Sequence, residues 1–344
     1  MIVSIQYMRA IAVLLVMFYH ATWKGEVYSG TSWDWFNFGI AGVDLFFIIS
    51  GYIMCYTASR KPTGIYKFMK ARFTRIIPLY WTLTLVTLVI YLIVPDKINS
   101  TGGDTSILHS FTLLPTDAKY LIQNGWTLSY EFFFYIIFSV GLIFSGTKRH
   151  LIPAVILTIL AIAGQLLKPD NVYLGFMTNP ILIEFVMGIA VFRLMKRYEF
   201  PKQIGVALCL SSIFLFAGVS YWGETGDRVI DYGIPCLLLF IGLINLEHEL
   251  QQNKHNPLSR VMGKVGDSSY SAYLIHPFVL VIASVIFSKL GITNFGNLFI
   301  ISLVLGSVLT GWICYVALEK PLNKFFRGKS KGGIKGNKEP TLSK

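Results

Sequence analysis

Long apolar runs constrain this sequence more than any other feature. They approach the roughly 17–25 residues that an α-helix needs to cross a membrane. Apolar side chains make up 54% of the 344 residues and charged side chains only 14%, whereas a soluble domain has about 45–50% and roughly 25%. This composition excludes a soluble globular enzyme, and it also excludes a disordered chain. We therefore predict an all-α polytopic membrane protein with about ten transmembrane helices in one bundle.

The predicted spans are residues 5–23, 40–59, 78–94, 126–145, 151–167, 178–195, 204–220, 229–246, 268–289 and 297–317. Lys and Arg concentrate on the cytoplasmic side of such a bundle. Most of the 30 Lys and Arg residues lie in alternate connections, at 60–77, 146–150, 196–203 and 247–267, and in the tail from residue 318. We therefore expect both termini in the cytoplasm, an integral membrane domain at 1–320, and a basic, disordered tail at 321–344.

The cysteines and the net charge indicate no additional site. Cys55, Cys209, Cys236 and Cys314 lie within apolar stretches and form no CxxC pair, so we expect neither a disulfide framework nor a metal site. The net charge of +12 is explained by the cytoplasmic connections and by attraction of the tail to anionic membrane lipid. We expect no nucleic-acid partner.

Ionisable residues inside the predicted spans are the candidates for function, because a charge at the membrane centre costs a few kcal/mol. Arg9 and His20 share the first span. Eleven residues at about 100° each bring them onto one face, about 16 Å apart along the helix axis. We expect Arg9 toward the cytoplasm and His20 beyond the midplane. The alternative is an arginine that extends to the inner headgroups and a histidine packed at the outer rim.

Three carboxylates lie in or at predicted spans. Asp44 begins the second span at a depth similar to that of His20, where a carboxylate can fix the tautomer of an imidazole. Its alternative role is a helix N-terminal charge that the helix dipole favours. Glu131 lies among aromatic residues in the fourth span, where it needs a partner such as Arg9 or His20. Glu184 is placed similarly in the sixth span.

Two arginines and one more histidine complete the set. Arg72 and Arg75 precede the third span at i and i+3, on one face if this segment is helical. Two guanidinium groups suit a phosphorylated cytoplasmic ligand, although positive-inside topology alone also supplies arginines here. His276 lies near mid-depth in the ninth span, directly before Pro277. Its alternative role is to satisfy a backbone carbonyl that the proline frees.

Five segments, in this order, resemble the acyltransferase family 3 of integral membrane acyltransferases. They are residues 6–12 with His20, residues 42–52, residues 72–75, residues 126–129 with Glu131 and Tyr135, and residues 269–276. The resemblance covers the whole chain except the lysine-rich tail. The family often has Leu-Arg-Gly where this chain has Met8-Arg9-Ala10, and Ser where it has Thr127, but neither departure removes a reactive group.

The resemblance implies a membrane O-acyltransferase of the bacterial inner or plasma membrane. Such an enzyme moves an acyl group, commonly acetyl, from cytoplasmic acyl-coenzyme A to a sugar hydroxyl of an extracytoplasmic polysaccharide, lipid-linked glycan or O-antigen. The start of the chain is most similar to the exopolysaccharide O-acetyltransferase branch. Acetyl-coenzyme A or another acyl-coenzyme A is then a donor substrate, with no permanently bound cofactor. The matching segments add as further candidate site residues Trp126, Ser129, Tyr135, Tyr270, Tyr273 and His276.

For the donor, we predict that Arg72 and Arg75 hold the phosphates of coenzyme A at the inner mouth. Arg9 would orient the thioester or the phosphates. For the reaction, we predict His20 as the general base for the acceptor hydroxyl.

In this hypothesis, Asp44 or Glu131 holds the imidazole of His20. Direct attack and a transient acyl-His20 intermediate both stay open. A lipid or glycan transporter also stays open, because buried charges mark substrate paths as well, and so does a non-catalytic subunit of an envelope-polysaccharide assembly complex. The sequence leaves open whether the chain forms a homo-oligomer.

Overall fold

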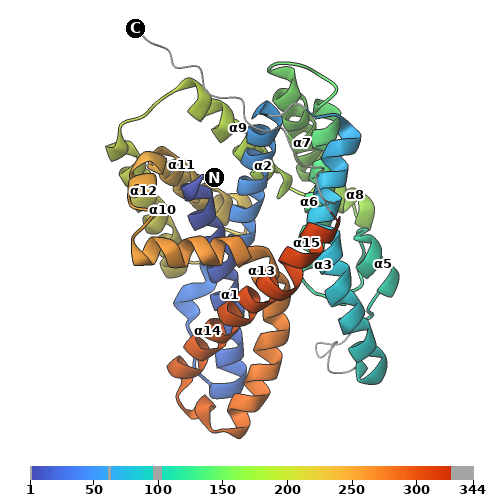
Figure 1. The fold of residues 1–344 in the computed structure, drawn as a ribbon, viewed down its shortest axis with the longest axis vertical. Coiled ribbons are helices and arrows are strands. Elements are labelled where there is room, and N and C mark those ends of the chain that lie inside the picture. The colour runs from blue at the N-terminus through green and yellow to red at the C-terminus, as the bar shows by residue number, and fades with distance from the viewer. Residues whose placement is uncertain (1, 61–62, 96–102, 327–344) are drawn as a thin grey trace, which may run out of the picture.

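The computed structural model describes residues 2–60, 63–95 and 103–326, and within these ranges the chain is helical and contains no β-strand (Figure 1). The α-helices are α1 Val3–Ser29, α2 Gly42–Arg60, α3 Ile65–Ile93, α5 Ile107–Thr112, α6 Gly125–Gly141, α7 Lys148–Leu167, α8 Val172–Met177, α9 Leu182–Arg197, α10 Lys202–Trp222, α11 Ile234–Asn245, α12 Glu247–Gln252, α13 Pro257–Lys289, α14 Gly296–Cys314 and α15 Lys320–Phe326. Short 3₁₀ helices, η1 Asp34–Ala41 and η3 Ile292–Asn294, and π-helical turns, η2 Val229–Gly233 and η4 Tyr315–Glu319, join them.

Eight helical segments of the described ranges are long and apolar enough to cross a membrane. The other two predicted spans are also helical, but they are shorter: α6 has 17 residues, and η2 with α11 forms the apolar helix Val229–Asn245. The prediction of an all-α polytopic membrane protein is confirmed, with eight full-length spans where about ten were expected. The side on which each terminus lies stays a prediction.

Two helices begin well before the predicted spans. Helix α3 starts at Ile65, so Pro78 lies inside the helix and Arg72 and Arg75 belong to it. Helix α13 starts at Pro257 and continues through Pro277. Hydropathy detects only the apolar part of each helix, whereas the backbone stays helical through the polar residues at its end. Of the predicted tail, residues 321–326 belong to α15, and residues 327–344 lie outside the described residues.

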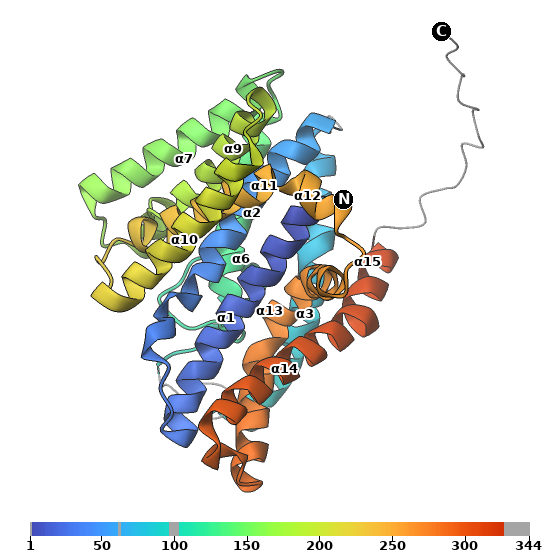
Figure 2. The same ribbon diagram turned by 90° about the vertical axis from the view of Figure 1, so that its left-hand side faces the viewer.

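Helix α1 lies at the centre of the bundle, with α13 and α14 on one side and α2 on the other (Figure 2). Helices α7, α9, α10 and α11 lie together beyond α2. Small residues permit the closest crossings, as is usual between membrane helices. A Cβ atom at Gly51 of α2 would lie 2.2 Å from the carbonyl oxygen of Phe185 on α9, and one at Gly266 of α13 would lie 2.1 Å from that of Gln6 on α1.

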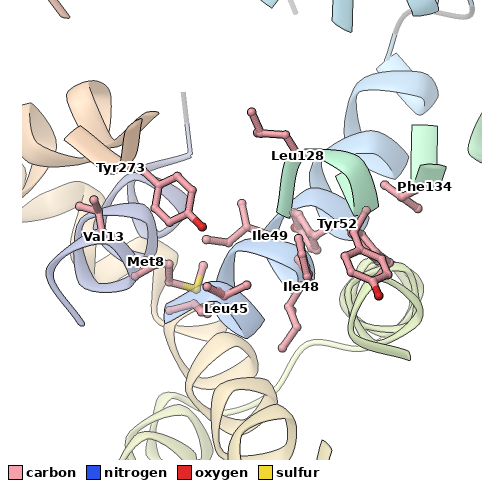
Figure 3. Close-up of a cluster of buried hydrophobic side chains, with 14 of the residues drawn as sticks. Met8, Val13, Leu45, Ile48, Ile49, Tyr52, Leu128, Phe134 and Tyr273 are labelled. Carbon is pink, nitrogen blue, oxygen red and sulfur yellow. The ribbon is translucent and has the colours of Figure 1, made fainter. Parts of the chain in front are cut away.

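The apolar core joins these helices around α2. Figure 3 shows Met8 and Tyr273 on one side of Ile49, and Leu128 and Phe134 on the other. All five side chains are buried. They come from α1, α2, α6 and α13, so the core fixes the four helices relative to one another.

An acidic side chain satisfies the start of α1. The carboxylate of Glu247 accepts hydrogen bonds from the backbone N–H groups of Val3, at 2.9 Å, and Ser4, at 2.7 Å. The first N–H groups of a helix have no partner within the helix, and a negative charge is favoured there. Glu247 belongs to α12, so this contact ties the beginning of the chain to the segment that precedes α13.

Candidate active site

A cavity of about 310 Å³ lies between α1, α2, α3, α6 and α13. Along α2 its lining extends from Thr57 to Val43, which corresponds to about 21 Å of helix rise. Most of the wall is apolar, and its polar side chains include Arg9, Gln6, Ser50, Thr57, Arg75, Thr127, Glu131, Tyr135, Ser269, Tyr270 and Tyr273. The hydroxyl of Ser269 is buried and has no hydrogen-bond partner within the described ranges. The cavity is therefore long and narrow, with a few polar groups directed into it.

Two guanidinium groups from different helices converge on this cavity, Arg9 from α1 and Arg75 from α3. Among the described residues, neither has a hydrogen bond or an ion pair. Arg9 lies close enough to Arg75, Glu319 and Glu131 for their charges to act on it. Two like charges in a mainly apolar cavity are unfavourable unless an anion compensates them. Two predicted ligand-binding residues are thus brought together.

Arg72, which we expected beside Arg75, does not line the cavity. Its guanidinium lies 5.8 Å from the ring centroid of Phe68 and 6.0 Å from that of Tyr135, and it donates to the sulfur of Met54. The spacing of i and i+3 places both arginines on adjacent parts of α3, but the deeper one alone reaches the cavity. Arg72 instead packs behind Tyr135, which does line it.

Glu131 faces the same cavity from α6. Its Oε1 atom accepts hydrogen bonds from the hydroxyl of Tyr135 and from Ser50, the latter at 3.4 Å. The prediction that Glu131 contacts Arg9 or His20 directly is wrong. The hydroxyl groups of Tyr135 and Ser50 provide the hydrogen bonds of the carboxylate instead. Arg9 acts on Glu131 only through its charge.

Two hydroxyl groups in the cavity wall form a pair between α6 and α13. The hydroxyl of Tyr273 lies 3.0 Å from that of Thr127, which also lies 2.9 Å from the carbonyl oxygen of Asn124. A carbonyl can only accept, so Thr127 donates to Asn124 and Tyr273 donates to Thr127. The lone pairs of the Tyr273 hydroxyl remain available toward the cavity.

Two histidines pair next to Tyr273. Nδ1 of His20 lies 3.1 Å from Nε2 of His276, and the two rings stack with centroids 5.2 Å apart. His276 is fully buried, and its ring centroid lies 6.0 Å from that of Tyr273. Neither histidine belongs to the cavity lining. The expected carbonyl contact also exists, since Nδ1 of His276 lies 2.9 Å from the carbonyl oxygen of Tyr273.

Asp44 does not hold the imidazole of His20. Its fully buried carboxylate forms a bidentate ion pair with Arg228, at 2.9 Å from Nε and 2.7 Å from a terminal nitrogen. Burial lowers the pKa of Arg228, but the charges of Asp44 and Glu184 and the hydrogen bond to Asp44 together raise that pKa above its ordinary value. Glu184 is buried beside Asp44. The prediction that Asp44 orients His20 is therefore corrected, because a guanidinium 184 positions away occupies the carboxylate.

The remaining candidates have structural partners. Tyr270 lines the cavity and donates to the carbonyl of Ile76 at 2.8 Å. Ser129 lies outside the lining and donates to the carbonyl of Gly125 at 3.2 Å. Trp126 is partly exposed, and its ring makes an edge contact with that of Tyr130. In the described ranges, no three His, Cys, Asp or Glu side chains gather closely enough to hold a metal ion.

Sequence reasoning did not identify Arg228 or Glu319. Arg228 is a lone basic residue in an outer connection, against the positive-inside bias, and that was its only signal. Glu319 lies just past the last predicted span, in the π-turn η4, and accepts a hydrogen bond from Ser271 at 2.5 Å. π-Turns often mark functional sites, but their presence cannot be recognised in the sequence.

The fold and the cavity define a polytopic membrane protein with a buried, positively charged site. The family model described as an acyltransferase domain matches residues 2–319. This chain belongs to acyltransferase family 3, as predicted, and it is an acyltransferase of a bacterial membrane.

Three relatives illustrate the similarity. The chain is 30% identical over 306 residues to the exopolysaccharide production protein ExoZ of Rhizobium meliloti (strain 1021), covering 86% of this chain and 92% of that protein. It is 24% identical to the acyltransferase MdmB of Streptomyces mycarofaciens, over 70% of this chain and 68% of that one. It is 23% identical to the O-acetyltransferase OatA of Staphylococcus aureus, over 92% of this chain and 56% of that one. No solved structure matches the chain significantly.

Proposed function

We propose that this protein transfers an acetyl group from acetyl-coenzyme A to a sugar hydroxyl of an extracytoplasmic polysaccharide. The observation that carries this proposal is the pair of unpartnered guanidinium groups, Arg9 and Arg75, in an otherwise mainly apolar cavity. Phosphates are anions that arginine binds with two parallel hydrogen bonds. The names of the relatives, which include exopolysaccharide production and O-acetyl transfer, support the same acceptor and acyl classes.

The shape of the cavity suits the donor. Its lining contains Ile2 at the start of the chain and Thr57 near the end of α2, the side expected in the cytoplasm. From there it continues along α2 for about 21 Å to Val43. In this proposal, Arg9 and Arg75 bind the phosphates, while the thin pantetheine arm occupies the apolar part and carries the thioester toward Tyr273. Arg72 packs against the ring of Tyr135 on the side away from the cavity and so holds Tyr135 in the cavity wall.

His20 is the proposed base. Its Nε2 takes the proton of the acceptor hydroxyl while that oxygen forms a bond to the thioester carbon. The carbon–sulfur bond then breaks, and the thiolate of coenzyme A takes the proton from the imidazolium. The products are the acetyl ester and free coenzyme A. A positioned base of this kind contributes roughly 10²–10⁴-fold to the rate.

Replacement of Arg75 tests the donor site. In purified protein reconstituted in lipid nanodiscs, thiol release from acetyl-coenzyme A should depend on an added oligosaccharide. Arg75→Gln should raise KM for acetyl-coenzyme A roughly 10- to 100-fold, because one charged hydrogen-bonding group is worth about 1.5–3 kcal/mol. Lys67→Gln is the matched control, since it removes an exposed positive charge from the same helix.

The control should leave KM unchanged within a factor of two. Equal increases in KM for Arg75→Gln and Lys67→Gln would show that the increase comes from the loss of overall positive charge, and they would reject the proposed donor site. Thiol release that does not respond to any glycan acceptor would reject the proposed reaction.

A further inference from the structure

We infer that His276 is a positioning residue that fixes the tautomer of His20, so that the lone pair of His20 lies on Nε2. The chain of hydrogen bonds begins at Pro277. A proline has no N–H group, so the carbonyl four residues earlier, that of Tyr273, loses its helical hydrogen bond. Two side chains use this carbonyl instead: Nδ1 of His276 lies 2.9 Å from it, and Nδ2 of Asn124 lies 2.5 Å from it.

The carbonyl determines where the hydrogen of His276 lies. A carbonyl oxygen only accepts, so Nδ1 of His276 carries a hydrogen. His276 is fully buried, and among the described residues no carboxylate contacts either ring of the histidine pair. A buried imidazolium without a counter-charge is very costly. His276 is therefore neutral, and its Nε2 carries the lone pair.

The lone pair of His276 in turn determines the tautomer of His20. The distance of 3.1 Å between Nε2 of His276 and Nδ1 of His20 is that of a hydrogen bond, which needs one hydrogen between the two nitrogens. His20 must supply it from Nδ1. A neutral His20 then has its only lone pair on Nε2, the atom that faces away from His276.

This arrangement replaces the carboxylate that usually orients a catalytic histidine. In Ser-His-Asp triads, an aspartate accepts from Nδ1 and keeps the lone pair on Nε2. Here Asp44 is occupied by Arg228, and a neutral imidazole anchored on a backbone carbonyl accepts from Nδ1 instead. When Nε2 of His20 takes the hydroxyl proton, Nδ1 keeps its hydrogen, so no second proton has to move. The catalytic consequence rests on the proposed function, whereas the tautomer itself does not.

Nitrogen NMR tests the tautomer directly. The chain has six histidines, and the signals of His20 and His276 in ¹⁵N-histidine-labelled protein can be assigned by their loss in His20→Gln and His276→Gln. We expect both rings to carry hydrogen on Nδ1 and a bare Nε2. In His276→Phe, which keeps a ring but has no acceptor, His20 should gain a population with hydrogen on Nε2. A bare Nδ1 on His20 in the native protein would overturn the inference.

Kinetics test the positioning role. His276→Phe should lower kcat roughly 10- to 100-fold and leave KM for acetyl-coenzyme A unchanged. His276→Gln should recover most of kcat, because its amide can donate to the Tyr273 carbonyl and accept from His20. His150→Phe is the matched control, since His150 is a buried histidine whose Nε2 lies 3.3 Å from the hydroxyl of Ser59, on another part of the bundle.

The outcomes separate the two proposals. Equal losses of kcat in His276→Phe and His276→Gln would overturn the positioning role. Full transfer by His20→Ala would reject the proposed base, and the NMR experiment would still decide the tautomer.

Discussion

At the residue scale, this protein places its buried charges in two different kinds of environment. Arg9 and Arg75 face a cavity and have no partner in the described part of the chain, whereas Asp44 and Arg228 satisfy each other with two hydrogen bonds. A paired buried charge contributes to structure, while an unpaired one that lines a cavity is available to a ligand. This contrast, rather than the identity of the residues, separates the binding site from the scaffold.

The Asp44–Arg228 pair makes a stability prediction. Arg228→Met leaves a fully buried carboxylate without its partner and should reduce the free energy of unfolding by about 3–5 kcal/mol. The double variant Asp44→Leu with Arg228→Met should recover most of this loss, because it removes both charges. Thermal unfolding in detergent measures both effects. Equal losses in the single and double variants would show that the two residues do not compensate each other.

Residue types at the site could be predicted from the sequence, but their partners could not. Arg9, Arg75, Glu131 and Tyr135 were recognised and do line the cavity. The pairing of His20 with His276 joins residues 256 positions apart, and each of these polar groups had several candidate partners of suitable chemistry at a similar depth. Only the helix packing selects one of them. Asp44 illustrates this point, since its expected partner was a histidine and its actual partner is an arginine.

At the element scale, the helices were predictable where they are apolar and less so where they are polar. Every predicted span falls on a helix, because a run of apolar residues has few alternatives in a membrane. The starts of α3 and α13 were placed too late, because hydropathy detects only the apolar part of each helix. Both helices also continue through a proline, Pro78 in α3 and Pro277 in α13. In α13 the freed carbonyl is reused by His276 and Asn124.

The close crossing of α2 and α9 at Gly51 leads to a prediction about stability. Gly51→Ala should destabilise the protein by about 1–3 kcal/mol, because the new methyl group would overlap the backbone of Phe185 and push α2 away from α9. Gly263→Ala is the control, since Gly263 is also inside a helix but has no atom within 4 Å of an added Cβ. It should leave the apparent melting temperature unchanged or slightly raised. A similar decrease in both variants would argue against the crossing.

At the scale of the whole molecule, the proposed donor site and the proposed base lie at different positions along the bundle. The cavity extends from Ile2 toward Tyr273, and the histidine pair lies next to Tyr273. With the expected topology and the proposed reaction, coenzyme A would enter from the cytoplasm and the sugar would approach from the opposite side. The reaction then takes place where the two routes meet.

Labelling of single cysteines tests this topology. In intact cells, Ser32→Cys, in the exposed connection after α1, should react with a membrane-impermeant maleimide. His255→Cys, in the exposed connection between α12 and α13, should react only after the membrane is permeabilised. The unmodified chain, whose four cysteines are buried or half-buried, provides the background. Reaction of both positions from the same side would contradict the predicted orientation.

The hydrogen bond between the hydroxyl groups of Tyr273 and Thr127 has a physiological consequence for the proposed reaction. An enzyme that passes a group through a bilayer risks opening a leak for ions, which would dissipate the proton gradient of the cell. Thr127, Tyr273 and Phe46 all line the cavity, and the ring of Phe46 makes an edge contact with that of Tyr273. In the proposed reaction, water entering beside the pantetheine arm would meet these packed side chains. If the proposed reaction is correct, this packing would let acetyl groups, but not coenzyme A, leave the cytoplasm without a path for ions.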